Sequence, residues 1–227
     1  MRLLLLSSSR VAGRGFLDAY ERSMREFLGD GCCAGAFLPY ASVAVPWAEY
    51  SRSTAARLAA MGYRLTGADP ASADAIVVGG GNTFQLLREL HARGLLDAIR
   101  ARVAAGVPYV GWSAGANVAC PSIRTTNDMP IVFPPSFDAL GLVPFQINPH
   151  YTDAQPPGHM GETREQRLEE FLAVAPQTTV VGLREGSALR VEGAQVTLLG
   201  PHPVRLFRAG SAPRELPPGD VSAALAA

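Results

Sequence analysis

One stretch, Gly111-Trp112-Ser113-Ala114-Gly115-Ala116-Asn117, indicates the fold of this chain more strongly than any other. An apolar run at residues 107–110 leads into it, and a helix-forming segment at residues 116–119 follows. A strand, a sharp turn with serine at its apex and a helix form the nucleophile-elbow pattern G-x-S-x-G. The pattern predicts that the turn exposes the Ser113 hydroxyl as a nucleophile and aims the Ala114 N–H at a developing oxyanion. The alternative is an ordinary strand-to-helix turn with a capping serine.

Apolar runs alternate with segments of helical periodicity along most of the chain, and the loops between them are short. We expect helices at residues 16–28, 47–61, 83–92, 95–105 and 163–173, and strands at residues 3–6, 36–40, 63–66, 75–78 and 107–110. This alternation predicts an α/β fold with a mostly parallel sheet that helices cover on both faces.

The C-terminal part of the chain is rich in β-prone segments. They occupy residues 179–183, 188–192, 195–199 and 204–207, and predict an antiparallel C-terminal edge of the sheet. Because no linker is long enough to divide the chain, residues 1–227 are predicted to form one α/β domain of hydrolase type. The Pro- and Ala-rich tail from about residue 212 is expected to be loosely held.

Composition excludes several classes of chemistry. The net charge is +0, from 20 basic and 20 acidic residues, and no basic stripe exists, which argues against nucleic acid as a partner. All 20 basic residues are arginine. Because the chain has no lysine, a lysine Schiff base, a Ser-Lys dyad and a P-loop lysine are all excluded.

Cysteine content and apolar runs bear on the compartment. Cys32, Cys33 and Cys120 form no disulfide framework, and an odd count suits a reducing environment. The apolar run at residues 3–6 is too short for a signal-peptide core. No run approaches the ~20 apolar residues that span a bilayer. We therefore expect a cytoplasmic protein without a membrane partner.

A serine nucleophile needs a general base, and the base needs a carboxylate to orient it. His150 follows a β-prone segment at residues 145–149, and open parallel sheets place functional groups at strand ends. His202, between two prolines, is the other candidate base. For the carboxylate, Glu185 follows a second β-prone run, and Asp128 lies in a polar cluster. A solvated turn glutamate is the plain alternative for Glu185.

Two further features carry polar chemistry. Gly79-Gly80-Gly81 follows a strand and precedes a helix, but it lacks the G-x-G-x-x-G spacing and a following lysine, so phosphate binding is disfavoured. Arg164 lies near the start of the expected helix at residues 163–173, where a guanidinium could bind a carboxylate in a bidentate manner. The alternative is a solvated surface arginine.

Five blocks of the sequence, in order and in register, resemble peptidase E, the aspartyl dipeptidase family. They are the elbow GWSAGAN at residues 111–117, GGGNTFQLL at 79–87, IRTTNDMP at 123–130, QINPHY at 146–151 and GETREQR at 161–167. The resemblance extends from Leu3 to about Gly200, and no block matches the tail after Gly210. It implies a glutamine-amidotransferase-like α/β fold.

The resemblance also implies an activity and its residues. It implies a serine-type dipeptidase that hydrolyses Asp-Xaa dipeptides through an acyl-enzyme. The implied triad is Ser113, His150 and Glu185. The implied oxyanion hole consists of the backbone N–H groups of Gly81 and Ala114.

Substrate recognition follows from the same blocks. The resemblance implies that Arg164 binds the aspartate side chain and that Asn82 contacts substrate. Asp128 either contacts substrate or supports a residue that does. No metal and no cofactor are implied. The expected partner is a small peptide, and a homodimer is left open.

Other functions remain open at this point. An α/β-hydrolase esterase shares the elbow and has the chain order Ser, acid, His, which Ser113, Glu185 and His202 satisfy. A cyanophycinase, which cleaves an aspartate-rich polymer, has a similar elbow. A non-catalytic binding module of the glutamine-amidotransferase-like fold is the third alternative.

Overall fold

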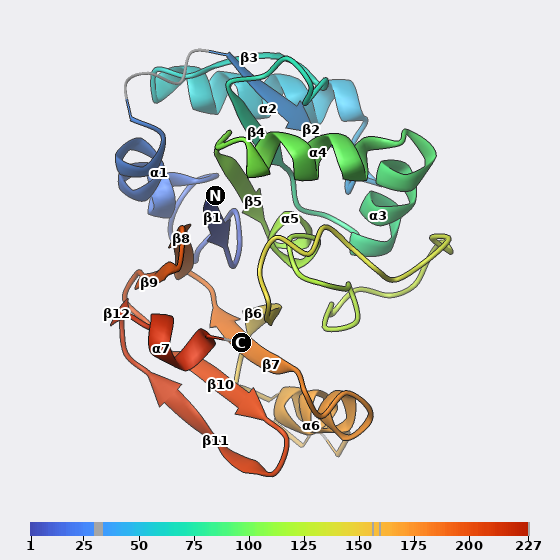
Figure 1. Ribbon diagram of the computed structural model, residues 1–227, viewed down its shortest axis with the longest axis vertical. Helices are drawn as coiled ribbons and strands as arrows, with labels where there is room; N and C mark the ends of the chain where they lie inside the picture. The colour runs from blue at the N-terminus through green and yellow to red at the C-terminus, as the bar shows by residue number, and fades with distance from the viewer. Residues whose placement is uncertain (30–33, 156, 159, 227) are drawn as a thin grey trace.

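The computed structural model of the chain describes residues 1–29, 34–155, 157–158 and 160–226. Its strands form two sheets, one below the other in Figure 1. The larger sheet has the spatial order β12 (Gly219–Asp220), β9 (Gln195–Leu199), β8 (Ala188–Glu192), β1 (Arg2–Leu6), β5 (Tyr109–Trp112), β4 (Ala75–Val78), β2 (Ala34–Leu38), β3 (Arg64–Gly67). The smaller sheet has the order β11 (Ser211–Leu216), β10 (Val204–Arg208), β7 (Thr179–Arg184), β6 (Gln146–Tyr151).

The larger sheet confirms the predicted α/β fold, but it is mixed. Strands β1, β5, β4, β2 and β3 pair in parallel. Strands β8, β9 and β12 extend the sheet beyond β1 in antiparallel pairing. The antiparallel edge follows from local chain geometry, because the short turn between β8 and β9 returns the chain directly beside the strand it leaves.

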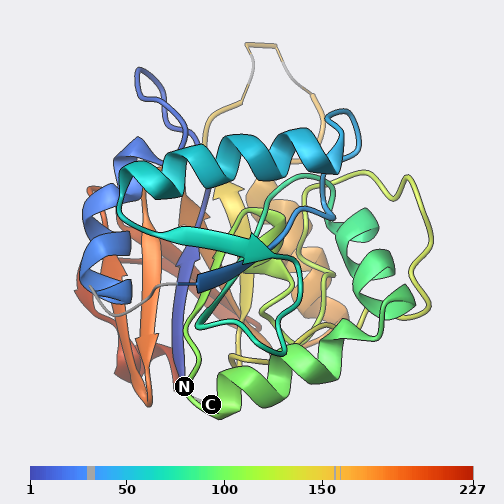
Figure 2. The same cartoon turned by 90° about the horizontal axis from the view of Figure 1, so that it is seen from above.

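Helices cover both faces of the larger sheet, as Figure 2 shows. On one face lie α1 (Glu21–Leu28) and α2 (Trp47–Ala60), and on the other lie α3 (Thr83–Ala92), α4 (Leu95–Ala104) and α5 (Ala114–Asn117). Successive side chains of β1 alternate between the two layers. Leu3 and Leu5 pack with α3 and α4, whereas Leu4 and Leu6 pack with α1 and α2. Burial on both faces therefore explains the unbroken apolar run of β1.

The smaller sheet corrects the expected arrangement of the C-terminal strands. Segments 179–183 and 204–207 were predicted at the edge of the main sheet, but β7 and β10 pair with each other and β7 pairs in parallel with β6. A parallel pair needs a crossover, and α6 (Arg164–Val174) supplies it. This helix buries Leu168 and Leu172 against β7 and β10.

The C-terminal tail is also more ordered than its composition suggests. Strand β11 pairs with β10, β12 pairs with β9, and a short helix α7 (Ser222–Leu225) follows. Val221 and Leu225 are buried in the larger core. Backbone pairing and the burial of these two apolar side chains stabilise the segment. Its prolines interrupt the sequence pattern by which a strand would be recognised. The single-domain expectation for residues 1–227 stays a prediction.

The structure gives partial information on two expectations, that the cysteines form no disulfide and that no segment spans a membrane. Cys120 is buried and unbonded, while Cys32 and Cys33 lie outside the described residues. Within the described ranges, no helix has the length and apolar character needed to cross a bilayer.

The C-terminal ends of four strands converge where the two sheets meet. In the larger sheet, β1 and β5 end side by side, with Leu6 paired to Trp112. In the smaller sheet, β6 and β7 end side by side, with Tyr151 paired to Arg184. The residues that follow or close these strands form the candidate site.

Candidate active site

Ser113 occupies a strained turn between β5 and α5. Its backbone has φ 54° and ψ −112°, a region that costs a non-glycine residue about 1–3 kcal/mol. The flanking glycines are sterically required: a Cβ on Gly115 would lie 2.2 Å from the Val78 carbonyl oxygen, and one on Gly111 would lie 2.3 Å from the Gly115 carbonyl oxygen. The close approach of β4, β5 and α5 therefore explains both glycines of the motif.

Three predicted residues form one continuous hydrogen-bond chain. The Ser113 Oγ lies 2.9 Å from His150 Nε2, and His150 Nδ1 lies 2.6 Å from Glu185 Oε1. An ionised carboxylate only accepts hydrogen bonds, so the proton of the neutral imidazole resides on Nδ1. Nε2 then has a free lone pair that faces the serine hydroxyl. This arrangement can take a proton from Ser113 and stabilise the resulting imidazolium.

The structure distinguishes the two candidate histidines and the two candidate carboxylates. His150 bonds to both Ser113 and Glu185. The recorded contact of His202 is through its backbone carbonyl, which accepts from Ser187 Oγ at 3.2 Å. Asp128 bonds to the N-terminus of α3 instead of to His150.

The glycine turn after β4 lies directly against the elbow. A Cβ on Gly80 would lie 3.0 Å from the Ser113 Cβ, and one on Gly81 would lie 2.3 Å from the Ala41 carbonyl oxygen. Gly81 also has φ 140°, which favours glycine. Within the described part of the chain, the N–H groups of Gly81 and Ala114 bond to no protein atom. Among the described residues, both N–H groups are therefore free to donate to a bound group.

Asn82 and Asp128 meet at the first turn of α3. Asn82 caps this helix, since its Oδ1 accepts from the Gln85 N–H at 3.0 Å, and its Nδ2 donates to the Met129 carbonyl at 2.9 Å. Asp128 Oδ2 accepts from Thr83 N at 2.7 Å and from Thr83 Oγ1 at 2.6 Å. These bonds join the loop that carries Asp128 to the glycine turn. The predicted contacts of Asn82 and Asp128 with substrate stay predictions.

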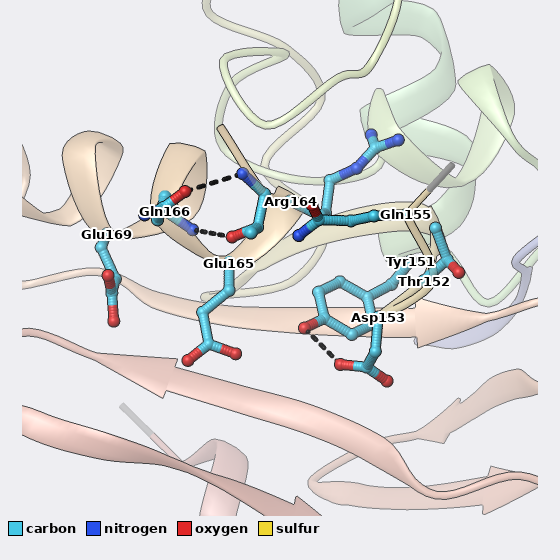
Figure 3. Close-up of a pocket in the computed structure, with 9 residues that line it drawn as sticks. Tyr151, Thr152, Asp153, Gln155, Arg164, Glu165, Gln166 and Glu169 are labelled. Atoms are coloured by element: carbon cyan, nitrogen blue, oxygen red, sulfur yellow. Dashed lines mark hydrogen bonds between the residues drawn. The ribbon is translucent and has the colours of Figure 1, made fainter. Parts of the chain in front are cut away.

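Arg164 lines a separate pocket of about 330 Å³, which shares no lining residue with the glycine turn. Tyr151, the next residue after His150, forms part of its wall. Figure 3 shows the Arg164 side chain extending in the opposite direction from Glu165 and Glu169. Burial, with repulsion from Arg167 added, lowers the pKa of the Arg164 guanidinium. Asp153, Glu165 and Glu169 also line the pocket, but among the described residues Arg164 itself has no carboxylate partner, since Asp153 pairs with Arg184 and Glu165 with Arg205.

Arg184, another arginine near this pocket, is already paired. Its guanidinium bonds to Asp153 Oδ2 at 2.5 Å and to Glu215 Oε2 at 2.7 Å. Burial opposes ionisation of Asp153, but hydrogen bonds from Arg184 and Tyr151 outweigh it and lower the pKa of that carboxyl. A second carboxylate would have to displace these partners.

Sequence reasoning missed Ser7 and Tyr20. The buried Ser7 Oγ accepts from the His150 N–H at 2.9 Å and donates to the Leu183 carbonyl at 2.7 Å. The Tyr20 hydroxyl accepts from the Gly186 N–H at 2.9 Å. The available signal was the run of serines directly after the buried strand β1. Its meaning depends on which strands lie beside β1, and sequence order does not reveal that.

In the described ranges no three His, Cys, Asp or Glu side chains gather as metal ligands would. The expectation that neither a metal nor a cofactor is needed stays a prediction.

Comparisons with known proteins identify the family of this chain. The sequence model of Peptidase family S51 matches residues 3–199. Peptidase E of Citrobacter koseri is 54% identical over 218 residues, which cover 92% of this chain and 95% of the relative. Peptidase E of Salmonella arizonae is 52% identical with the same coverage. A peptidase from an acI-B1 actinobacterium shares the fold, with TM-score 0.67, 18% identity and coverage of 96% of this chain and 94% of that chain. The chain therefore belongs to peptidase family S51 and is a serine peptidase.

Proposed function

We propose that this peptidase releases N-terminal aspartate from Asp-Xaa dipeptides, with Ser113 as nucleophile, His150 as general base and acid, and Glu185 as the orienting carboxylate. The observation that carries the proposal is the continuous hydrogen-bond chain Ser113–His150–Glu185. It is supported by the relatives named Peptidase E, which match nearly the whole chain.

The geometry allows each step of acyl transfer. Ser113 Oγ attacks the scissile carbonyl while its proton passes to His150 Nε2. The tetrahedral oxyanion is held by the N–H groups of Gly81 and Ala114, each worth about 3 kcal/mol in the transition state. His150 then protonates the leaving amine, and an aspartyl ester of Ser113 remains. Water, deprotonated by His150, hydrolyses this ester and restores the serine.

Aspartate selectivity is assigned to Arg164. Its guanidinium is half-buried and unpaired among the described side chains, and burial lowers its pKa. A substrate carboxylate would supply the missing anion, and the planar guanidinium favours a bidentate contact. The N-terminus of α6, where Arg164 lies, adds a weak positive field of the same sign.

Replacing Arg164 with methionine tests this assignment. We expect kcat/KM for Asp-Leu to fall roughly 10- to 150-fold, the equivalent of about 1.5–3 kcal/mol for a hydrogen bond to a charged group. Asn-Leu should lose far less, because its amide never formed the ion pair. Measuring both substrates on both proteins gives a double-mutant cycle.

Arg22→Met is the control, because Arg22 is an exposed arginine on α1 that does not line this pocket. It should leave the ratio of Asp-Leu to Asn-Leu hydrolysis unchanged. Equal losses on the two substrates in Arg164→Met would instead show that Arg164 is structural. Asn82 and Arg184 would then be the next residues to test for recognition of aspartate.

A further inference from the structure

A second pocket, of about 380 Å³, adjoins the glycine turn, and Arg164 is not among its lining residues. The backbone of Gly80 and Gly81 forms one wall, and Val43, Val45 and Ile131 supply apolar side chains from two loops. Val43 and Ile131 are 61% and 52% exposed, respectively. Water therefore covers apolar surface directly beside a candidate oxyanion donor.

The chemistry of this pocket differs from that of the Arg164 pocket. None of the described residues that line it carries a charge. Burial raises the pKa of Tyr50 to about 12, so its phenol is neutral. The Tyr50 hydroxyl already accepts a hydrogen bond from Trp112 Nε1 at 2.9 Å. An aspartate carboxylate would find no cation among the residues that line this pocket, whereas an aliphatic side chain would displace water from apolar walls.

The two pockets adjoin the catalytic chain through different elements. One shares Gly80 and Gly81 with the turn that touches Ser113, and the other shares Tyr151 with the strand that carries His150. A carbonyl that is bound at Gly81 and attacked by Ser113 has two substituents. If the aspartate substituent extends toward Arg164, the uncharged pocket, which Gly81 also lines, is available to the other substituent.

We propose that the pocket formed by Val43, Val45, Ile131 and the glycine turn binds the side chain of the leaving residue and selects an aliphatic one. The assignment rests on the proposed Asp-Xaa activity. It predicts a substrate class narrower than that activity: aspartyl dipeptides whose second residue is leucine, isoleucine or a comparable apolar residue. Burying the additional carbons of leucine should favour Asp-Leu over Asp-Ala by about 10-fold or more in kcat/KM.

The test compares Asp-Leu, Asp-Ala and Asp-Asp on the wild type and on a Val43→Ser, Ile131→Ser double variant. The wild type should prefer Asp-Leu and disfavour Asp-Asp, and the double variant should lose most of the preference for leucine over alanine. Val174→Ser is the control, since Val174 is 72% exposed and lies at the end of α6, outside this pocket. It should keep the wild-type preference.

Three results would overturn the assignment. Equal hydrolysis of Asp-Leu and Asp-Ala by the wild type would reject the proposed subsite but not the proposed dipeptidase activity. A double variant that changes the ratio of Asp-Leu to Asn-Leu hydrolysis would mean that the pocket takes the aspartate instead. Hydrolysis of no aspartyl dipeptide at all would reject the proposed function together with the subsite.

Ser7 makes an independent set of contacts with the catalytic segment. Its buried hydroxyl joins the end of β1 in the larger sheet to both β6 and β7 in the smaller one. The bond to the His150 N–H holds a residue whose φ is 53°, which L-residues rarely adopt. The Ser7 hydroxyl also donates to the carbonyl of Leu183, a residue two positions before Glu185 in the chain. One hydroxyl therefore braces both partners of the Ser113–His150–Glu185 chain from the sheet that carries Ser113.

We infer that Ser7 is a positioning residue for His150. Ser7→Ala should lower kcat about 10-fold or more, because a small displacement of the base is costly, while KM changes less than about twofold. Ser187→Ala is the matched control: it removes a buried serine hydroxyl whose partner is the His202 carbonyl at 3.2 Å. It should lower Tm without a comparable loss of kcat.

The kinetics are measured well below the Tm of each variant. If Ser7→Ala does not fold, Ser7→Cys, which keeps the volume but donates and accepts weakly, replaces it. An equal kcat for the Ser7 and Ser187 variants would overturn the inference, because Ser7 would then serve stability alone. A rise in KM with unchanged kcat would overturn it as well.

Discussion

Ser113→Ala is expected to lower kcat for Asp-Leu by about 10,000-fold or more, with Tm nearly unchanged. The loss is large because removal of the nucleophile closes the acyl-enzyme route. The change in stability is small because the recorded bond of the Ser113 hydroxyl is to His150, and alanine keeps the same Cβ on the strained turn. Steady-state kinetics and thermal unfolding of the same preparations provide both measurements.

Ser53→Ala is a suitable control, since this serine on α2 is exposed and, among the described residues, its hydroxyl donates to the Tyr50 carbonyl within its own helix. It should retain the wild-type kcat and Tm. A Ser113→Ala protein that kept more than about a tenth of the wild-type kcat would contradict the assignment of the nucleophile.

His150→Ala is expected to abolish most of the activity, and His202→Ala to leave kcat close to wild type. His150 Nε2 faces Ser113 Oγ at 2.9 Å, whereas the recorded bond of His202 is through its backbone carbonyl. In the wild type, kcat/KM should fall toward acid pH, because a protonated imidazole cannot accept the serine proton. His150→Ala should remove this acid limb together with the activity.

The backbone of His150 calls for a second variant. At φ 53°, alanine adds strain, whereas asparagine tolerates the left-handed region. His150→Asn should therefore unfold near the wild-type temperature and still lack activity. If His202→Ala were the inactive variant and His150→Ala the active one, the esterase order Ser113, Glu185, His202 would be supported instead.

Local pattern predicted the larger sheet and its helices well. The helix expected at residues 83–92 coincides with α3 (Thr83–Ala92), and the strand at 75–78 coincides with β4 (Ala75–Val78). Each element coincides with its own stretch of apolar periodicity, and a glycine or a capping residue marks where that stretch begins or ends. The helix expected at 16–28 begins as an α-helix only at Glu21, because a 3₁₀ turn at Asp18–Tyr20 precedes it.

Local sequence patterns could not predict the smaller sheet. A β-prone segment such as Thr179–Arg184 has the same composition whether it pairs with β6 or extends the main sheet. The choice depends on α6, which buries Leu168 and Leu172 against that strand. The tail was obscured for a related reason, since the prolines near β11 hide a strand that is held by its pairing with β10.

The sequence by itself determined the parallel core of the sheet, the position of the elbow and the set of residues that could serve the chemistry, because each depends on spacing within a short segment. Only the tertiary structure decided which of these residues meet. Ser113 and His150 are 37 residues apart, and His150 and Glu185 are 35 apart. Ser7 reaches His150 across 143 residues. Contacts at such separations depend on strand order and register, which arise from the packing of the whole chain. The contact of His150, and not His202, with Ser113 and the contacts of Ser7 with the catalytic segment were therefore visible only in the folded molecule.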